Sequence, residues 1–150
     1  MKNLLIVLFL SISATLFSQQ EYNIKKGAVA QGYDVVAYFS NKAIKGNKKF
    51  ATDYDGAKFM FSSDENLKLF LKNPKKHVPQ YGGFCAYAIG KNGEKVSIDP
   101  KTFEIRDSKL YLFYNAWGTN TFKLWKDEGA EKLRKQADKN WEQIISESKD

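Results

Sequence analysis

The chain contains one cysteine, Cys85, and one histidine, His77, and these two side chains are candidates for soft-metal or thiol chemistry. A thiolate and an imidazole both bind copper-like ions, and a lone thiol can also cycle through a sulfenic acid or a mixed disulfide. Gly82 and Gly83 precede the cysteine, and two glycines let the backbone bend and a ligand approach closely. Simple core packing is the alternative for Cys85, because cysteine is among the most buried residue types.

His77 and Cys85 are separated by a short segment, so a turn between them could bring both side chains to one ion. We predict Cys85 and His77 as the candidate ligands of a soft metal ion such as copper. A histidine that is satisfied by the fold or faces solvent is the alternative. One cysteine excludes an intramolecular disulfide, and one cysteine with one histidine excludes a four-ligand zinc site of the Cys/His kind.

Asp34, Tyr81, Gly82 and Gly83 are the candidates for holding a small ligand or cofactor. The carboxylate of Asp34 could serve such a site, or it could tie down a turn. Tyrosine and tryptophan side chains are expected mostly in the core, although a buried tyrosine hydroxyl needs a partner and can line a pocket. This aromatic set is Tyr38, Tyr81, Tyr87, Tyr111, Tyr114, Trp117 and Trp125. No phosphate-binding glycine loop, nucleophile elbow or paired-histidine motif occurs, so no catalytic residue is assigned.

Short alternating apolar segments predict strands in the part of the chain that precedes residue 115. Asp55-Gly56 stands between two such segments, which is typical of a hairpin turn, and Asn92-Gly93 and Asp107-Ser108 indicate further turns. The last four predicted strands would form an antiparallel meander. The predicted strands are residues 35–39, 50–54, 58–61, 84–89, 96–98, 103–106 and 110–114.

Helical patterns predict one helix in the middle of the chain and a long one at its end. Ser62 and Glu65 form a capping box that predicts a helix start, and Asn73-Pro74 ends that helix. From Asn120 onward the apolar spacing is three and four residues, which predicts an amphipathic helix. The fold class is therefore α+β, with an antiparallel sheet of hairpins and a meander packed by a short middle helix and a long C-terminal helix.

Composition and charge place the chain among single-domain globular proteins. It has 150 residues, of which 43% are hydrophobic and 27% charged, and this length excludes a multidomain enzyme. The net charge of +7 comes almost entirely from lysines scattered along the sequence, with only Arg106 and Arg134 as arginines. Nucleic-acid readers concentrate arginine on one face, so this pattern disfavours nucleic acid as a partner.

The first residues resemble a secretory signal peptide, with Lys2 ahead of an apolar run over residues 4–10 and small residues after it. The run is shorter than the roughly 20 residues that a membrane-spanning helix needs, so no stable membrane anchor is expected. We predict a signal peptide over residues 1–18, a lead-in over 19–31 and a single domain over 32–150. The mature protein would be periplasmic or extracellular.

Several motifs in order resemble the exported, long form of the YHS domain family. They are residues 32–39, Asn73-Pro74, Pro79-Gln80, residues 81–88, Asp99-Pro100, residues 110–115, Trp125 and residues 137–141. Short YHS domains accompany copper and other heavy-metal transporters and are linked to metal binding through cysteines, and some long-form relatives are selenoproteins. The resemblance therefore implies metal or redox chemistry.

The chain departs from the short YHS pattern at the positions of its cysteines. Ser62 and Asn66 stand where those domains carry a cysteine pair, and residues 35–38 lack the early cysteine. His77 stands where the family usually has tyrosine, so the resemblance gives it no ligand role. Only Cys85 remains as a candidate soft ligand, and it is one that the long form itself provides.

Three functions fit the sequence. The first, which the family association favours, is an exported accessory protein that handles a soft, copper-like metal through Cys85. The second is a single-thiol redox protein. The third is a non-catalytic interaction module in which Cys85 only packs and the C-terminal helix or an aromatic surface meets a protein partner.

Overall fold

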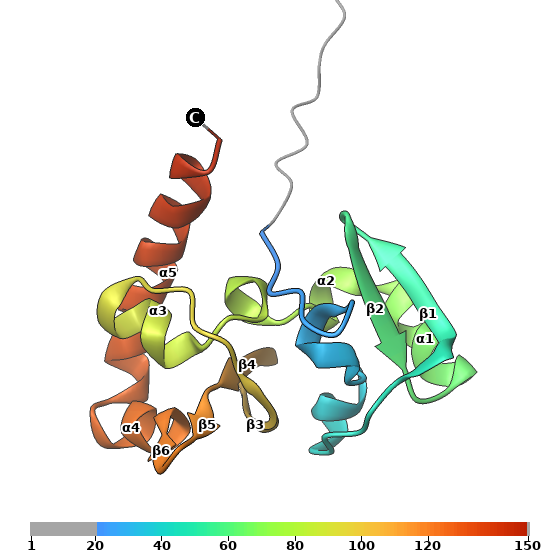
Figure 1. Cartoon of the computed structure of the whole chain (residues 1–150), viewed down its shortest axis with the longest axis horizontal. Coiled ribbons are helices and arrows are strands. Elements are labelled where there is room, and N and C mark those ends of the chain that lie inside the picture. Colours follow the sequence, from blue (N-terminus) through green and yellow to red (C-terminus); the bar gives the residue numbers. More distant parts are fainter. Residues whose placement is uncertain (1–20, 150) are drawn as a thin grey trace, which may run out of the picture.

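A computed structural model describes residues 21–149 of the chain, with one hairpin lying between two packed halves (Figure 1). The first half contains β1 (Asn47–Tyr54), β2 (Ala57–Phe61), α1 (Asp64–Lys72) and α2 (Pro74–His77), after the 3₁₀ helices η1 (Val29–Gly32) and η2 (Ala37–Ser40). The central hairpin is β3 (Asp99–Arg106) with β4 (Lys109–Phe113). The second half contains α3 (Ala86–Asn92), β5 (Asn115–Ala116), β6 (Thr119–Asn120), α4 (Thr121–Asp127) and α5 (Ala130–Glu147), and η3 (Gln80–Gly83) leads into it.

The predicted α+β class is confirmed, but the strands form three separate two-stranded sheets rather than one. The β1–β2 hairpin turns at Asp55-Gly56 and the β3–β4 hairpin turns at Asp107-Ser108, as predicted. All four turn residues have positive φ, although only Gly56 is a glycine. The outer edge of β4 meets only a single parallel bridge from Cys85 to Leu112. No strand therefore extends the central hairpin into a meander among the described residues.

The hairpin of β5 and β6 places an unusual residue at its turn. Trp117 and Gly118 form the turn, and Trp117 has φ 53° and is 97% exposed. A type I′ turn of this kind needs positive φ at both central residues, which normally favours asparagine, aspartate or glycine. Trp117 therefore lies outside the core, as an exception within an aromatic set that was predicted to be mostly core.

Two segments predicted as strands are helical. Residues 86–89 of the predicted strand 84–89 form the first part of α3, and Gly93 ends that helix in the left-handed region by donating its N–H to the carbonyls of Ala88 and Ile89. Residues 37–39 of the predicted strand 35–39 belong to η2. Both apolar segments are short, and a short apolar run fits a buried strand and a buried helical turn equally well.

Ser63, not Ser62, caps α1. The Oγ of Ser63 accepts a hydrogen bond from the backbone N–H of Asn66 at 3.1 Å. Ser62 instead donates its hydroxyl to Asp34 Oδ2 at 2.6 Å. The helix thus begins one residue later than the capping box predicted, because the first serine is used in a tertiary contact.

The predicted C-terminal helix is two helices, since the chain breaks at Gly129, where φ is +102°. The buried side of α5 carries Leu133, Ala137 and Trp141. Helix α3 packs closely on it, because a Cβ on Gly90 would lie only 2.6 Å from the carbonyl oxygen of Leu133. This contact joins α3 and α5 into one layer.

The interior is divided into two hydrophobic cores that share strand β4. The first core is centred on Phe59, Phe61 and Phe70, and the second on Trp125 and Trp141. The side chains of β4 alternate between them: its leucines, Leu110 and Leu112, lie in the first core, and its aromatic residues, Tyr111 and Phe113, lie in the second.

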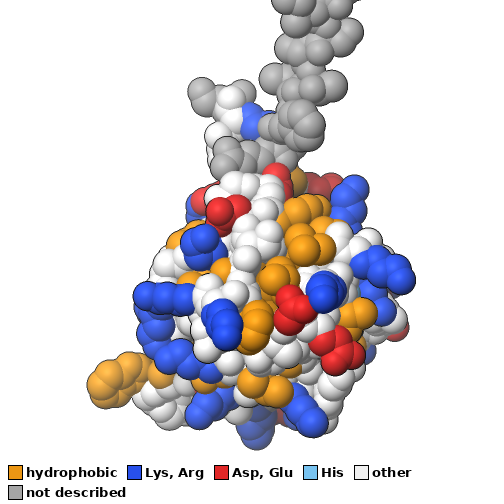
Figure 2. All heavy atoms as spheres, turned by 90° about the vertical axis from the view of Figure 1, so that its right-hand side faces the viewer, with side chains coloured by type: hydrophobic (Ala, Val, Ile, Leu, Met, Phe, Trp, Pro, Cys, Tyr) orange, Lys and Arg blue, Asp and Glu red, His pale blue; other side chains and the backbone are white. Residues whose placement is uncertain are grey.

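The surface shows no concentration of charge on the face drawn in Figure 2, where lysines and arginines are spread among polar and apolar side chains. None of the described helices is long and apolar enough to span a bilayer.

Candidate functional site

Cys85 is completely buried at the start of α3, and the neighbouring polar groups occupy its thiol. Its Sγ lies 3.3 Å from Thr121 Oγ1 and accepts a hydrogen bond from the backbone N–H of Tyr114 at 3.4 Å. The Thr121 hydroxyl donates to the carbonyl of Tyr114 at 2.7 Å, so the thiol is the donor toward Thr121. Cys85 therefore has both its donor and its acceptor capacity used inside the protein.

His77 lies in a separate environment from Cys85. Its Nδ1–H donates to the carbonyl of Asn73 at 3.0 Å, and its ring packs edge-on against Phe39 with centroids 5.2 Å apart. Burial lowers the pKa of His77 below its ordinary value, because it disfavours the charged imidazolium. Within residues 21–149, no three His, Cys, Asp or Glu side chains are grouped so that they could hold a metal ion. Cys85 and His77 thus have different hydrogen-bond partners in the fold, and their shared binding of a soft metal ion stays a prediction.

Asp34 is fully buried, and its carboxylate is the centre of a hydrogen-bond network. Oδ1 accepts from the backbone N–H groups of Val36 and Ala37, which begins η2. Oδ2 accepts from the N–H and the hydroxyl of Ser62 and from Nδ2 of Asn66, at 2.8, 2.6 and 2.8 Å. Asp34 thus ties down a turn, and it also fixes the end of β2 to the first turn of α1.

Ser62 and Asn66, which stand where short YHS domains carry cysteines, meet at this one oxygen of Asp34. The fold therefore does bring those two sequence positions together. In this chain they carry a hydroxyl and an amide that bind a carboxylate, and no thiol is available there.

The backbone approach that Gly82 and Gly83 permit is used by the chain itself. A Cβ on Gly82 would lie 1.9 Å from the carbonyl oxygen of Glu21. Asn23 donates its backbone N–H to the carbonyl of Gly82 at 2.8 Å and its Nδ2 to that of Gly83 at 3.2 Å. The segment predicted only as a lead-in, residues 19–31, thus packs on Gly82 and Gly83 through Glu21 and Asn23. A ligand was predicted to approach the backbone at these two glycines.

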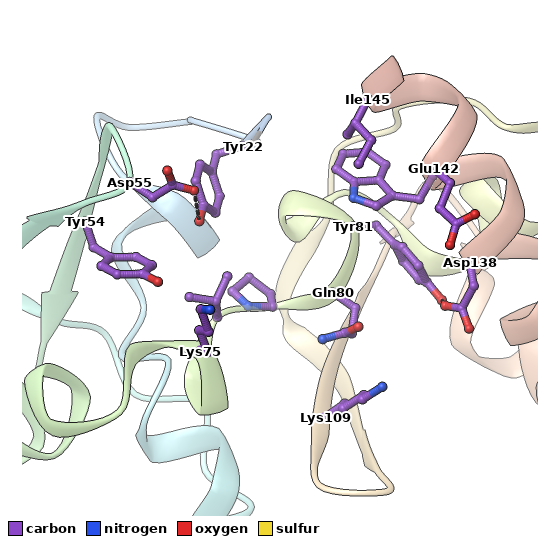
Figure 3. Close-up of a pocket in the computed structure, with 13 residues that line it drawn as sticks. Tyr22, Tyr54, Asp55, Lys75, Gln80, Tyr81, Lys109, Asp138, Glu142 and Ile145 are labelled. Carbon is purple, nitrogen blue, oxygen red and sulfur yellow. Dashed lines mark hydrogen bonds between the residues drawn. The ribbon is translucent and has the colours of Figure 1, made fainter. Parts of the chain in front are cut away.

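A cleft of about 930 Å³ lies between the two halves, and Tyr81 is the one predicted site residue that lines it (Figure 3). Tyr81 sits in the left-handed region, with φ 54°, and its hydroxyl donates to Asp138 on α5 at 2.8 Å. Burial and the neighbouring Asp138 raise the pKa of Tyr81 well above its ordinary value, so it remains a hydroxyl donor. A non-glycine residue held in this conformation costs free energy, and such residues cluster at ligand sites.

The opposite wall of the cleft carries a second tyrosine–carboxylate pair. Tyr22 donates its hydroxyl to Asp55 Oδ2 at 3.2 Å, and burial followed by the Asp55 charge raises the pKa of Tyr22 above its ordinary value. Figure 3 shows this pair facing the wall of α5, which contributes Trp141 and Glu142. Sequence reasoning missed these residues, because they come from the lead-in, a hairpin turn and the last helix, and no local motif links them.

The comparison with known families supports the resemblance to the YHS domain family within the first half of the chain. Residues 35–81 match the family model of the YHS domain, which confirms the resemblance for this segment, short of half of the chain. The matched segment contains Ser62, Asn66 and His77 and ends before Cys85. No curated protein and no solved structure matched the chain.

Proposed function

We propose that this chain, which carries a YHS domain at residues 35–81, is a non-catalytic binding module that takes a small ligand in the cleft between its two halves. The observation that carries this proposal is the contrast between the open cleft and the closed surroundings of Cys85. Small-molecule sites occur preferentially between packed units, and pockets of roughly 300–1,000 Å³ suit them. The two tyrosine–carboxylate pairs supply oriented polar groups on facing walls.

A thermal-shift screen of amino acids, short peptides, sugars and organic cations tests this proposal. A compound that raises the melting temperature should lose its effect in Glu142→Trp, because an indole at this cleft-lining position fills the space. Gln143→Trp is the matched control, since Gln143 is also an exposed α5 residue and does not line the cleft. Compounds that raise the melting temperature of Glu142→Trp by as much as that of the unaltered chain would argue against the cleft as the binding site.

Metal handling through Cys85 is the second candidate, and the metal association of the YHS family supports it. A soft ion at Cys85 would have to displace the contacts with Thr121 and with the N–H of Tyr114. The same requirement applies to the single-thiol redox function, because the thiol must be reached before it can react.

Cys85 is expected to be unreactive toward a thiol reagent such as dithionitrobenzoate until the protein unfolds. Cys85→Ser should reduce the free energy of unfolding by roughly 1 to 3 kcal/mol, because a hydroxyl replaces a thiol in a buried, fitted position. Cu(I) affinity, measured with a competing chelator, should be the same for the two proteins. Rapid reaction in the folded state together with a loss of Cu(I) affinity in Cys85→Ser would favour the metal function. Rapid reaction without that loss would favour the redox function.

We also propose that the protein is exported and that its mature chain begins near Gln19. The apolar run that supports this proposal lies outside the described residues. N-terminal sequencing of the protein recovered from the periplasm or medium should start at or within a few residues of Gln19. A retained Met1 in the cell pellet would contradict export.

A further inference from the structure

The charged side chains of the cleft are of both signs, and the signs are separated. Asp55 lies on the wall formed by the β1–β2 turn, and Asp138 and Glu142 lie on the α5 wall (Figure 3). In the same view Lys75 lies below Asp55, and Lys109 lies below Asp138 and Glu142. A ligand in the cleft would therefore meet negative charge at one end and positive charge at the other.

Most of these charges are not neutralised by another described residue. Asp138 pairs with Arg134 at 3.5 Å, but Asp55 accepts only the neutral hydroxyl of Tyr22. Neither Glu142 nor the two cleft lysines form an ion pair within residues 21–149. Among residues 21–149, two carboxylates and two ammonium groups of the cleft thus have no ion-pair partner that a ligand would have to displace.

We propose that the ligand is zwitterionic and is a short peptide with free amino and carboxyl termini; this inference rests on the proposed function of the cleft. The peptide ammonium lies between Asp55 and Glu142, and its carboxylate points toward Lys75 and Lys109. A ligand that is only anionic would be repelled by the carboxylates at one end of the cleft. A ligand that is only cationic would be repelled by the lysines at the other end. Charge of both signs on one ligand satisfies both ends.

The remaining lining fits the body of such a ligand. Tyr54, Val78, Trp141 and Ile145 present aromatic and aliphatic surface, which suits an apolar side chain. The amide of Gln80 also lines the cleft, where it can bond a peptide group. A volume of about 930 Å³ is at the upper end of the size range for small-molecule pockets, which favours a short peptide over a single amino acid.

Isothermal titration calorimetry of the whole protein with the tripeptide Ala-Phe-Ala tests the inference. N-acetylation of the peptide, which removes its ammonium, and C-amidation, which removes its carboxylate, should each weaken binding by about fivefold or more. Glu142→Gln should weaken the free tripeptide but leave the N-acetylated form unchanged. Lys109→Gln should weaken the free tripeptide but leave the C-amidated form unchanged. Lys139→Gln, an exposed α5 change outside the cleft, is the control and should change nothing.

The outcomes separate the ligand class from the cleft itself. Equal binding of the free and blocked tripeptides, or no binding of any of them, overturns the zwitterionic inference. If the screen nevertheless finds another compound whose effect Glu142→Trp removes, the proposed function stands and only the ligand class is wrong. If no compound binds in a way that Glu142→Trp removes, both fail.

Discussion

Replacing Asp34 with alanine is expected to lower the free energy of unfolding by about 4 kcal/mol, because several buried donors lose their shared acceptor at once. The N–H groups of Val36 and Ala37 and the groups of Ser62 and Asn66 all point to this carboxylate. Asp34 itself is fully buried, so the donors aimed at its carboxylate are turned away from bulk water. Loss of this network should also loosen η2 and the first turn of α1 together.

Denaturant unfolding measures this change, and Asp99→Ala is its matched control. Asp99 also accepts local hydrogen bonds, from the N–H of Lys101 at 3.0 Å and the hydroxyl of Thr102 at 2.9 Å, but it is only half-buried. Its loss should cost about 1 kcal/mol, since water can satisfy the freed donors. If Asp34→Ala costs no more than Asp99→Ala, the network is not the structural centre described above.

Gly82→Ala is expected to be the second most damaging change, at about 3 kcal/mol or more, because left-handed strain and a steric clash add together. The added Cβ would lie 1.9 Å from the carbonyl oxygen of Glu21, so the lead-in must move away. The hydrogen bond from Asn23 to Gly82 would be lost with it. Tyr22 would then leave the cleft, and binding of any cleft ligand should fall as well.

Gly27→Ala separates the two contributions. Gly27 also has positive φ, +77°, but a Cβ there would have no atom within 4 Å. This change should cost only about 1 to 2 kcal/mol, the price of the left-handed conformation. Limited proteolysis should cut near residue 24 faster in Gly82→Ala than in Gly27→Ala. Equal unfolding free energies for the two variants would contradict the packing of the lead-in on the glycine bend.

Local signals in the sequence were enough for the elements with strong turn or spacing patterns. Asp55-Gly56 and Asp107-Ser108 identified two hairpins, and Asn73-Pro74 identified the end of α1. The helical character of α3 was missed, since its apolar run is too short to separate the two periodicities. The position of the α1 cap was missed because Ser62 donates its hydroxyl to Asp34 instead of capping the helix. The two residues are 28 positions apart, so no local sequence pattern indicates this hydrogen bond.

The candidate site was less accessible to sequence reasoning than the fold. Asp34 was identified, but its bonds to Ser62 and Asn66 show that it organises the structure. Tyr81 was also identified, and it does line the cleft. Its partner Asp138 lies 57 residues away, and only the packing of α5 on η3 brings them together. Sites built from distant segments in this way leave no spacing in the sequence to recognise.

The alternation of β4 between the two cores determines what can fold alone. The segment that matches the YHS family ends at Tyr81, yet the first core is completed by Cys85, Leu110 and Leu112 from the second part of the chain. An excised fragment of residues 35–81 would therefore expose the apolar surface that these residues cover. We therefore expect that the segment matching the YHS family does not fold on its own, and that the two halves unfold in a single cooperative transition that β4 couples.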